Sequence, residues 1–109
     1  MISRIFILLF AVLPYVLSSY AYSVTPIIVA QKDKEFTVKS IDIKTGDSVR
    51  FKNEDPFFHN VFSLSDVSFF DLGSFPKGDH RDIKFEKPGV IEVECAIHPA
   101  MKMIINVKD

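Results

Sequence analysis

The chain has 109 residues, of which 25% are charged, and its formal net charge is −1. This length allows one domain at most, and the near-neutral charge argues against a nucleic-acid partner, which would require a basic face. Because the sequence holds one cysteine, an internal disulfide is excluded.

Residues 1–21 are predicted to be a signal peptide. Arg4 supplies a positive start, residues 5–13 form an apolar run that ends before Pro14, and residues 19–21 (Ser-Tyr-Ala) place small side chains where a signal peptidase cleaves. This run is shorter than the roughly 20 residues that cross a bilayer. We therefore expect cleavage after Ala21, with a retained membrane anchor as the alternative. Residues 22–109 then form an exported domain with no stable membrane insertion.

The first half of that domain is predicted to be strands. Residues 22–31 are apolar and β-branched, which is typical of a first strand, and residues 31–34 form a polar turn. Apolar and polar residues alternate over 36–44 and again over 49–52, after a turn at 45–47. Such a period of two predicts half-buried strands.

The second half continues the pattern after a turn at 53–56. Residues 57–62 form an apolar segment, residues 63–66 are polar, and residues 67–78 are expected to form a loop or short irregular strands. Alternation returns over 82–86, over 91–95 and from 101 to 107. Many short strands without a helix predict an all-β fold, either an antiparallel sandwich or a small barrel.

Three potential metal ligands, Cys95, His98 and Met101, follow one another at intervals of three residues. A thiolate, an imidazole and a thioether suit copper far better than calcium or magnesium, which prefer oxygen. Strand alternation turns Cys95 and Met101 inward at the two ends of a short loop. The loop can therefore bring all three donors around one point.

A fourth ligand has two candidates, His59 and His80. His59 lies in the aromatic segment after a turn, whereas His80 lies among charged residues and is expected to be a solvated loop histidine. Two imidazoles, a thiolate and a weak thioether are the donors of a blue-copper site. Zinc accepts the same donors, although its structural sites use Cys and His more often than Met. Met103 lies about 6.6 Å further along the strand than Met101 and is expected in the core.

The spacing Cys95-x-x-His98-x-x-Met101, with His59-Asn60-Val61 upstream, resembles that of the cupredoxins, and the short ligand loop is most similar to that of amicyanin-like methylamine utilization proteins. The resemblance covers residues 41–109 and implies a Greek-key β-sandwich with one type 1 copper. It implies His59, Cys95 and His98 as equatorial ligands and Met101 as the axial one. Asn60 would join the first ligand's segment to the loop near Cys95 by hydrogen bonds.

One departure lies in the loop, where family members often have proline before the second histidine and this chain has Ile97. The resemblance further implies a periplasmic electron carrier, expected to be a monomer, with a cytochrome c or an amine dehydrogenase as redox partner. His98, beside Ile97 and Pro99, is the expected electron port, and Phe57 and Phe58 could extend the apolar rim. An enzyme is not expected, because protein donors fill all four positions. The alternatives are a copper carrier or storage module, and a structural sandwich with a buried Cys95.

Overall fold

A computed structural model describes residues 7–9, 11–12, 14 and 25–109 of the chain. The predicted signal peptide, residues 1–21, lies mostly outside the described residues and stays a prediction. In the described part of the chain, no helix is long and apolar enough to cross a membrane.

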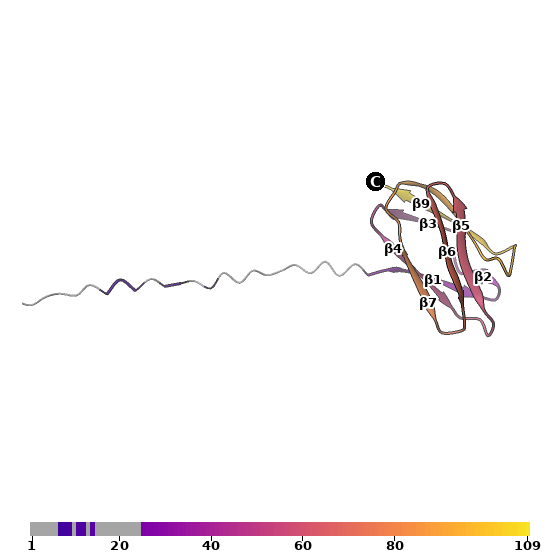
Figure 1. Cartoon of the computed structure of the whole chain (residues 1–109), viewed down its shortest axis with the longest axis horizontal. Coiled ribbons are helices and arrows are strands. Elements are labelled where there is room, and N and C mark those ends of the chain that lie inside the picture. Colours follow the sequence, from indigo (N-terminus) through magenta and orange to yellow (C-terminus); the bar gives the residue numbers. More distant parts are fainter. Residues whose placement is uncertain (1–6, 10, 13, 15–24) are drawn as a thin grey trace, which may run out of the picture.

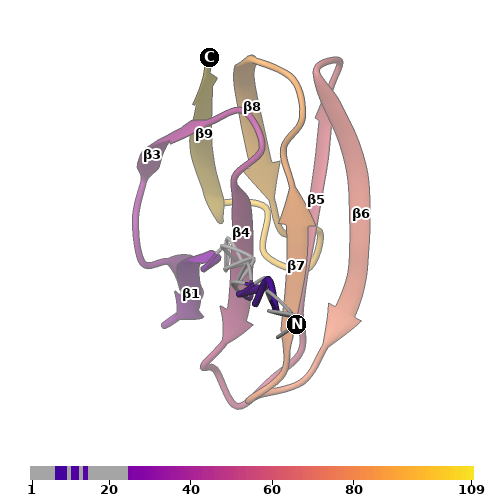
Figure 2. The same ribbon diagram turned by 90° about the vertical axis from the view of Figure 1, so that its left-hand side faces the viewer.

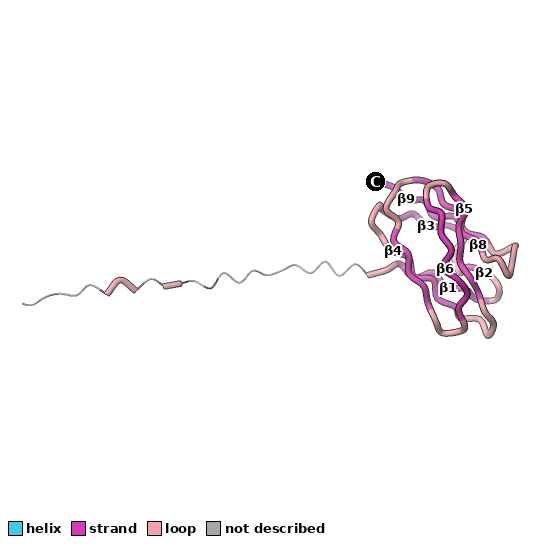
Figure 3. Tube along the Cα trace, viewed as in Figure 1, coloured by secondary structure: helices cyan, strands magenta, loops and turns pink. Residues whose placement is uncertain are grey.

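Nine strands and their connecting loops account for the described domain (Figures 1 and 3). The strands are β1 (Ile27–Lys32), β2 (Glu35–Phe36), β3 (Ser40–Lys44), β4 (Ser48–Asn53), β5 (His59–Ser65), β6 (Ser68–Phe75), β7 (His80–Lys84), β8 (Gly89–Glu94) and β9 (Lys102–Lys108). The strands are short and separated by frequent turns, as the sequence predicted.

The strands form a sandwich of two sheets, ordered β2-β1-β4-β7 and β3-β9-β8-β5-β6. Figure 2 shows β4 and β7 of the first sheet in front of β8 and β5 of the second. The predicted all-β sandwich is therefore confirmed. It is not antiparallel throughout, because β1 pairs with β4 and β3 pairs with β9 in parallel. Both parallel pairs join strands that are not consecutive in the chain.

Three predicted element boundaries were wrong by more than two residues. The first strand begins at Ile27 rather than at residue 22, and residues 22–24 lie outside the described part. The alternation over 36–44 belongs to two strands in different sheets, β2 and β3. Since each strand keeps the same period of two, the pattern does not reveal the crossing between the sheets.

The third boundary error concerns residues 63–78, where a polar break and an irregular loop were expected. β5 instead continues to Ser65, and β6 forms an eight-residue strand paired with it. Ser63 is fully buried, and its Oγ accepts a hydrogen bond from the Ser65 amide at 3.2 Å. A small hydroxyl with a local partner is therefore tolerated inside the strand.

The core lies between the two sheets, and the inward residues of β8 and β9 are those that the alternation predicted. Phe51, Phe75 and Phe85 are the most deeply buried aromatic side chains in this core, each at most 1% exposed. Met103 is also 1% exposed, as expected for a core methionine. Towards one end of the sandwich this core ends at Cys95 and Met101, where the chain leaves β8 and enters β9.

Candidate metal centre

Three potential ligands meet at this end of the sandwich: His59, Cys95 and His98. Their donor atoms all lie within 4.8 Å of one another. The Cys95 Sγ lies 3.7 Å from His59 Nδ1 and 4.0 Å from His98 Nδ1. Each imidazole therefore turns the same ring nitrogen towards the thiol.

Local backbone bonds explain why a spacing of three brings donors together. In the loop between β8 and β9, the His98 amide donates to the Cys95 carbonyl at 3.3 Å, and the Met101 amide donates to the His98 carbonyl at 2.8 Å. The Cys95 amide closes the loop on the Met101 carbonyl at 3.3 Å. These two successive turns stack Cys95, His98 and Met101 near one another, and no long excursion of the chain is needed.

The spacing of the donors fits a transition-metal ion. Typical bond lengths for such ions are about 2.0 Å to imidazole nitrogen and about 2.3 Å to thiolate sulfur. Both S···N separations, 3.7 and 4.0 Å, are shorter than the sum of one bond of each kind, so one ion could bind the thiolate and either imidazole. Two imidazoles and a thiolate are the donors that would hold a blue copper, with a thioether as a further, weaker donor.

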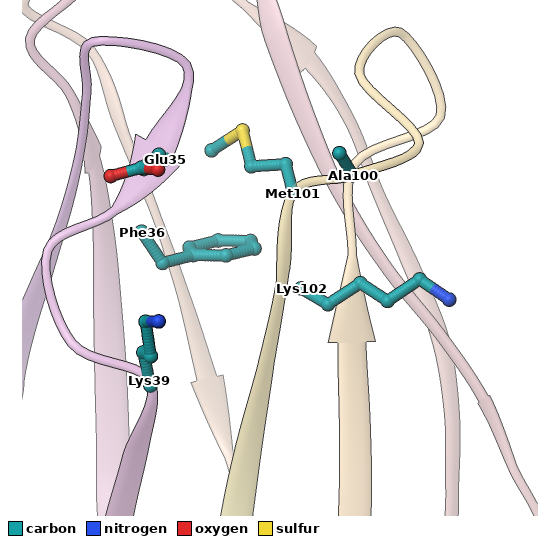
Figure 4. Close-up of a pocket in the computed structure, with 6 residues that line it drawn as sticks. All are labelled: Glu35, Phe36, Lys39, Ala100, Met101 and Lys102. Carbon is teal, nitrogen blue, oxygen red and sulfur yellow. The ribbon is translucent and has the colours of Figure 1, made fainter.

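Met101 lies at the other end of the loop and is 1% exposed. Figure 4 shows its side chain reaching from the start of β9 towards the strand that carries Glu35 and Phe36, while Lys102 points the opposite way. A hollow of about 250 Å³, lined by Glu35, Phe36, Lys39, Ala100, Met101 and Lys102, separates the loop from β2. The thioether is thus available inside the fold, next to the cluster's own loop.

Behind His59 lies a carboxylate that the sequence analysis missed. Asp55 Oδ2 is 2.7 Å from His59 Nε2, and Asp55 itself is only 4% exposed. Burial opposes ionisation of this carboxyl group, but hydrogen bonds from His59 and from the amides of Lys34 and Asp33 outweigh it and lower the pKa of Asp55. The carboxylate thus contacts the Nε2 side of the His59 ring, while Nδ1 faces Cys95.

The only sequence signal for Asp55 is its place in the turn before His59, four residues upstream. That spacing has no fixed meaning outside a helix, and an aspartate in a turn usually serves the turn itself. The partnership with His59 therefore becomes visible only in the folded chain.

Asn60 joins the segment of His59 to the ligand loop. Its Oδ1 accepts a hydrogen bond from the Ala96 amide at 2.6 Å, directly after Cys95. The Asn60 carbonyl accepts a second bond, from Gln31 Nε2 at 3.3 Å. Gln31 lies in β1 and is fully buried, so this bond connects β1 to the segment that carries His59. The chain on both sides of the cluster is thereby fixed in place.

One aromatic ring packs against the cluster, and two apolar side chains next to its histidines in sequence are exposed. The Phe57 ring packs against both imidazoles, with ring centroids 5.2 Å from His59 and 5.3 Å from His98. Phe58 and Ile97 are 56% and 50% exposed, and His98 is half-buried, whereas His59 is fully buried. Of the two imidazoles, His98 is therefore the one that reaches the surface.

His80 is not part of the cluster. It begins β7, where it pairs across the sheet with Lys52, and its side chain is exposed. The expected solvent exposure of His80 is confirmed, but the residue lies in a strand and not in a loop as predicted.

Comparisons with known proteins agree with this geometry. The family model of copper binding proteins, plastocyanin/azurin family, matches residues 24–108. A copper-containing nitrite reductase from Thermus scotoductus SA-01 is similar in structure, with a TM-score of 0.73 and 30% identity over 78% of this chain. The chain spans only 23% of that reductase. No curated protein matches the chain.

Two amicyanin structures share the fold. A variant in the reduced state has a TM-score of 0.72 and 22% identity, and a Cu(I) variant has a TM-score of 0.72 and 21% identity. Each alignment covers 76% of this chain and 82% of the amicyanin.

A two-sheet sandwich that holds a buried thiol against two imidazoles at one end defines a copper protein with the cupredoxin fold. The matched residues include the whole described domain except Asp109. The chain belongs to the plastocyanin/azurin family of copper binding proteins, and its cofactor is one type 1 copper.

Proposed function

We propose that this protein is an exported one-electron carrier whose copper ligands are His59, Cys95, His98 and, at the axial position, Met101. The observation that carries the proposal is the pair of imidazole Nδ1 atoms facing one buried thiol at 3.7 and 4.0 Å. A bound type 1 copper supplies a one-electron Cu(I)/Cu(II) couple. A carrier needs ligands that stay in place in both states, so their support by the fold matters.

That support is extensive around the cluster. Asp55 holds the His59 ring, Asn60 holds the Ala96 amide, and three backbone bonds hold the loop that carries His98 and Met101. Preorganised donors of this kind need little rearrangement when an electron arrives or leaves. The burial of Cys95 at 1% exposure keeps water away from the thiolate.

The exposed edge of His98 is the proposed electron port. Ile97 directly precedes His98, and Phe58 directly precedes His59. Each is half exposed or more, which gives this end of the molecule an apolar character suited to brief docking. The proposed partner is a redox protein in the periplasm, such as a cytochrome c or an amine dehydrogenase, and the carrier is proposed to act as a monomer. We propose no catalytic role, because the four protein donors leave no position for a substrate.

Copper binding is tested by adding Cu(II) to the purified metal-free protein and recording the visible spectrum. We expect an intense thiolate-to-copper absorption that is lost in Cys95→Ser and unchanged in His80→Ala, the matched control at a histidine outside the cluster. A wild-type protein that stays colourless with stoichiometric Cu(II) would refute the proposal.

Voltammetry separates a carrier from a copper store. An electron carrier gives a reversible one-electron wave, and replacing His98 with alanine should abolish rapid electron exchange along with the blue colour. Tight copper binding without a reversible wave would support the storage module instead.

A further inference from the structure

The hairpin formed by β1 and β2 lies directly against the segment that carries His59. Its turn consists of Asp33 and Lys34, whose φ angles of 54° and 60° place both residues in the left-handed region. This conformation directs two successive backbone amides towards the β4–β5 loop. Both amides end on Asp55: the Asp33 amide donates to Oδ1 at 2.7 Å, and the Lys34 amide donates to Oδ2 at 3.0 Å.

Asp55 is therefore held by more donors than a turn aspartate needs. Besides the two hairpin amides, its own amide donates to Asn53 Oδ1 at 2.8 Å, and Oδ2 also receives His59 Nε2 at 2.7 Å. Two of the three groups that reach the carboxylate oxygens are backbone N–H donors, and the third is His59 Nε2. The carboxylate can accept hydrogen bonds from three donors at once, because both of its oxygens are acceptors only.

The hairpin contacts the same segment at further points. The Gln31 side chain donates to the Asn60 carbonyl, and the Glu54 amide donates to the Gln31 carbonyl at 2.9 Å. The Lys34 ammonium lies 5.9 Å from the centre of the Phe57 ring. The hairpin thus borders the loop before His59 and, across the hollow in Figure 4, the side of Met101.

We propose that Asp55 is a positioning residue of the copper site: its carboxylate holds His59 in the Nε2–H tautomer. The two amides of the β1–β2 turn fix the Asp55 side chain in the position that this role requires. The proposal rests on the proposed role of His59 as a ligand through Nδ1. A hydrogen bond to the non-ligating nitrogen sets which nitrogen is free to bind metal. A carboxylate partner also raises the basicity of the ligand imidazole, and losing such a partner typically costs 10–100-fold in metal affinity.

The variant Asp55→Asn tests whether Asp55 sets the tautomer of His59 or only stabilises the turn. The asparagine amide can donate to His59 Nε2 and so hold the ring with its proton on Nδ1, where it blocks the metal. We expect a fall in Cu(II) affinity of about 10–100-fold. Cu(II) should lose more affinity than Cu(I), because the carboxylate's negative charge favours the higher oxidation state. The reduction potential should therefore rise, by about 59 mV for each tenfold difference between the two losses.

The matched control is Asp47→Asn. Asp47 Oδ2 accepts a bond from the Lys44 amide at 2.9 Å in the turn between β3 and β4, so the variant also removes one carboxylate that caps a turn. It should cost stability but leave the spectrum, Cu(II) affinity and potential unchanged. If Asp55→Asn changes affinity and potential by no more than Asp47→Asn does, Asp55 is only a structural cap and the proposal is wrong.

A measurement on the copper-free wild type decides the proposal even if Asp55→Asn does not fold. Nitrogen-15 NMR of the histidine rings should show His59 in the Nε2–H tautomer with a slowly exchanging proton. The Nδ1–H tautomer, or a rapidly exchanging mixture, would overturn the proposal. Because this readout needs no metal, it is independent of the copper spectrum, whose failure would instead refute the proposed function.

Discussion

At the scale of single residues, the candidate site depends on polar side chains that are buried and bonded. Cys95, His59 and Asp55 are each at most 4% exposed, and such groups are tolerated in an interior only when their hydrogen-bonding capacity is met. Here both ring nitrogens of His59 have a partner: Nε2 contacts Asp55, and Nδ1 contacts Cys95. The ligand set and its supporting residues are therefore one connected network.

Asn60 provides a test of this network at the residue scale. Asn60→Ala removes the acceptor of the 2.6 Å bond from the Ala96 amide and should lower the free energy of unfolding by about 1–3 kcal/mol. Amide hydrogen exchange at Ala96 should become faster. The control is Asn106→Ala, whose side chain donates to Asp42 at 3.0 Å on the exposed surface and should cost no more than about 0.5 kcal/mol. Equal losses in the two variants would contradict the role given to Asn60.

At the scale of elements, each strand end that meets the site is set by a specific turn. The three backbone hydrogen bonds of the β8–β9 loop place Cys95 and Met101 next to each other. In the β1–β2 hairpin, the left-handed conformation of Asp33 and Lys34 directs the turn towards Asp55. At the other end of β8, Gly89 has a φ of +147° and lies under the Val67 side chain. The start of β8, the strand that leads to Cys95, is therefore also tightly constrained.

Gly89→Ala should be costly for two reasons. A Cβ there would lie 2.7 Å from Val67 Cγ2, and the β-branched valine cannot easily rotate away. Together with the unfavourable φ, we expect a loss of roughly 2–5 kcal/mol in the free energy of unfolding, measured by urea denaturation. Gly46→Ala is the control, since its φ is +96° but no atom lies within 4 Å of the added Cβ. It should cost about 1–3 kcal/mol from backbone strain alone. A Gly89→Ala loss no larger than that of Gly46→Ala would argue against the contact.

At the scale of the whole molecule, the cluster joins the two sheets. His59 begins β5 and Cys95 directly follows β8, and both strands belong to the five-stranded sheet. Asp55 follows β4, and the hairpin amides lie between β1 and β2, all strands of the other sheet. A metal bound at the cluster would bind the folded chain and not the unfolded one, so binding and folding are coupled.

Copper should accordingly raise the melting temperature. With free copper at about 100 times the dissociation constant, binding adds about 2.7 kcal/mol, which corresponds to a rise of roughly 10–20 °C for a domain of this size. Removing the metal with a chelator should reverse the rise, and acid should weaken it, because protons compete with the metal for the thiolate and for the imidazole nitrogens. Cys95→Ser should melt at the same temperature with and without copper. A wild type that melts at one temperature in both conditions would contradict the proposed site.

Much of the fold could be read from local patterns. A period of two identified the faces of β4, β8 and β9, including the inward positions of Cys95 and Met103. The same pattern failed over residues 36–44, because alternation does not report which sheet a strand joins. It also failed over residues 63–78, because a buried serine and outward apolar residues hid a regular hairpin.

The amino-acid sequence by itself determined which donors are available and their order along the chain, since a spacing of three and an inward parity are local properties. The surroundings of the two remaining histidines also favoured His59 over His80. Only the tertiary structure placed His59 against Cys95 and showed which groups hold it. His59 and Asp55 depend on contacts between segments that lie about 20 to 40 residues apart. Such contacts arise from the packing of two sheets, which no local period encodes.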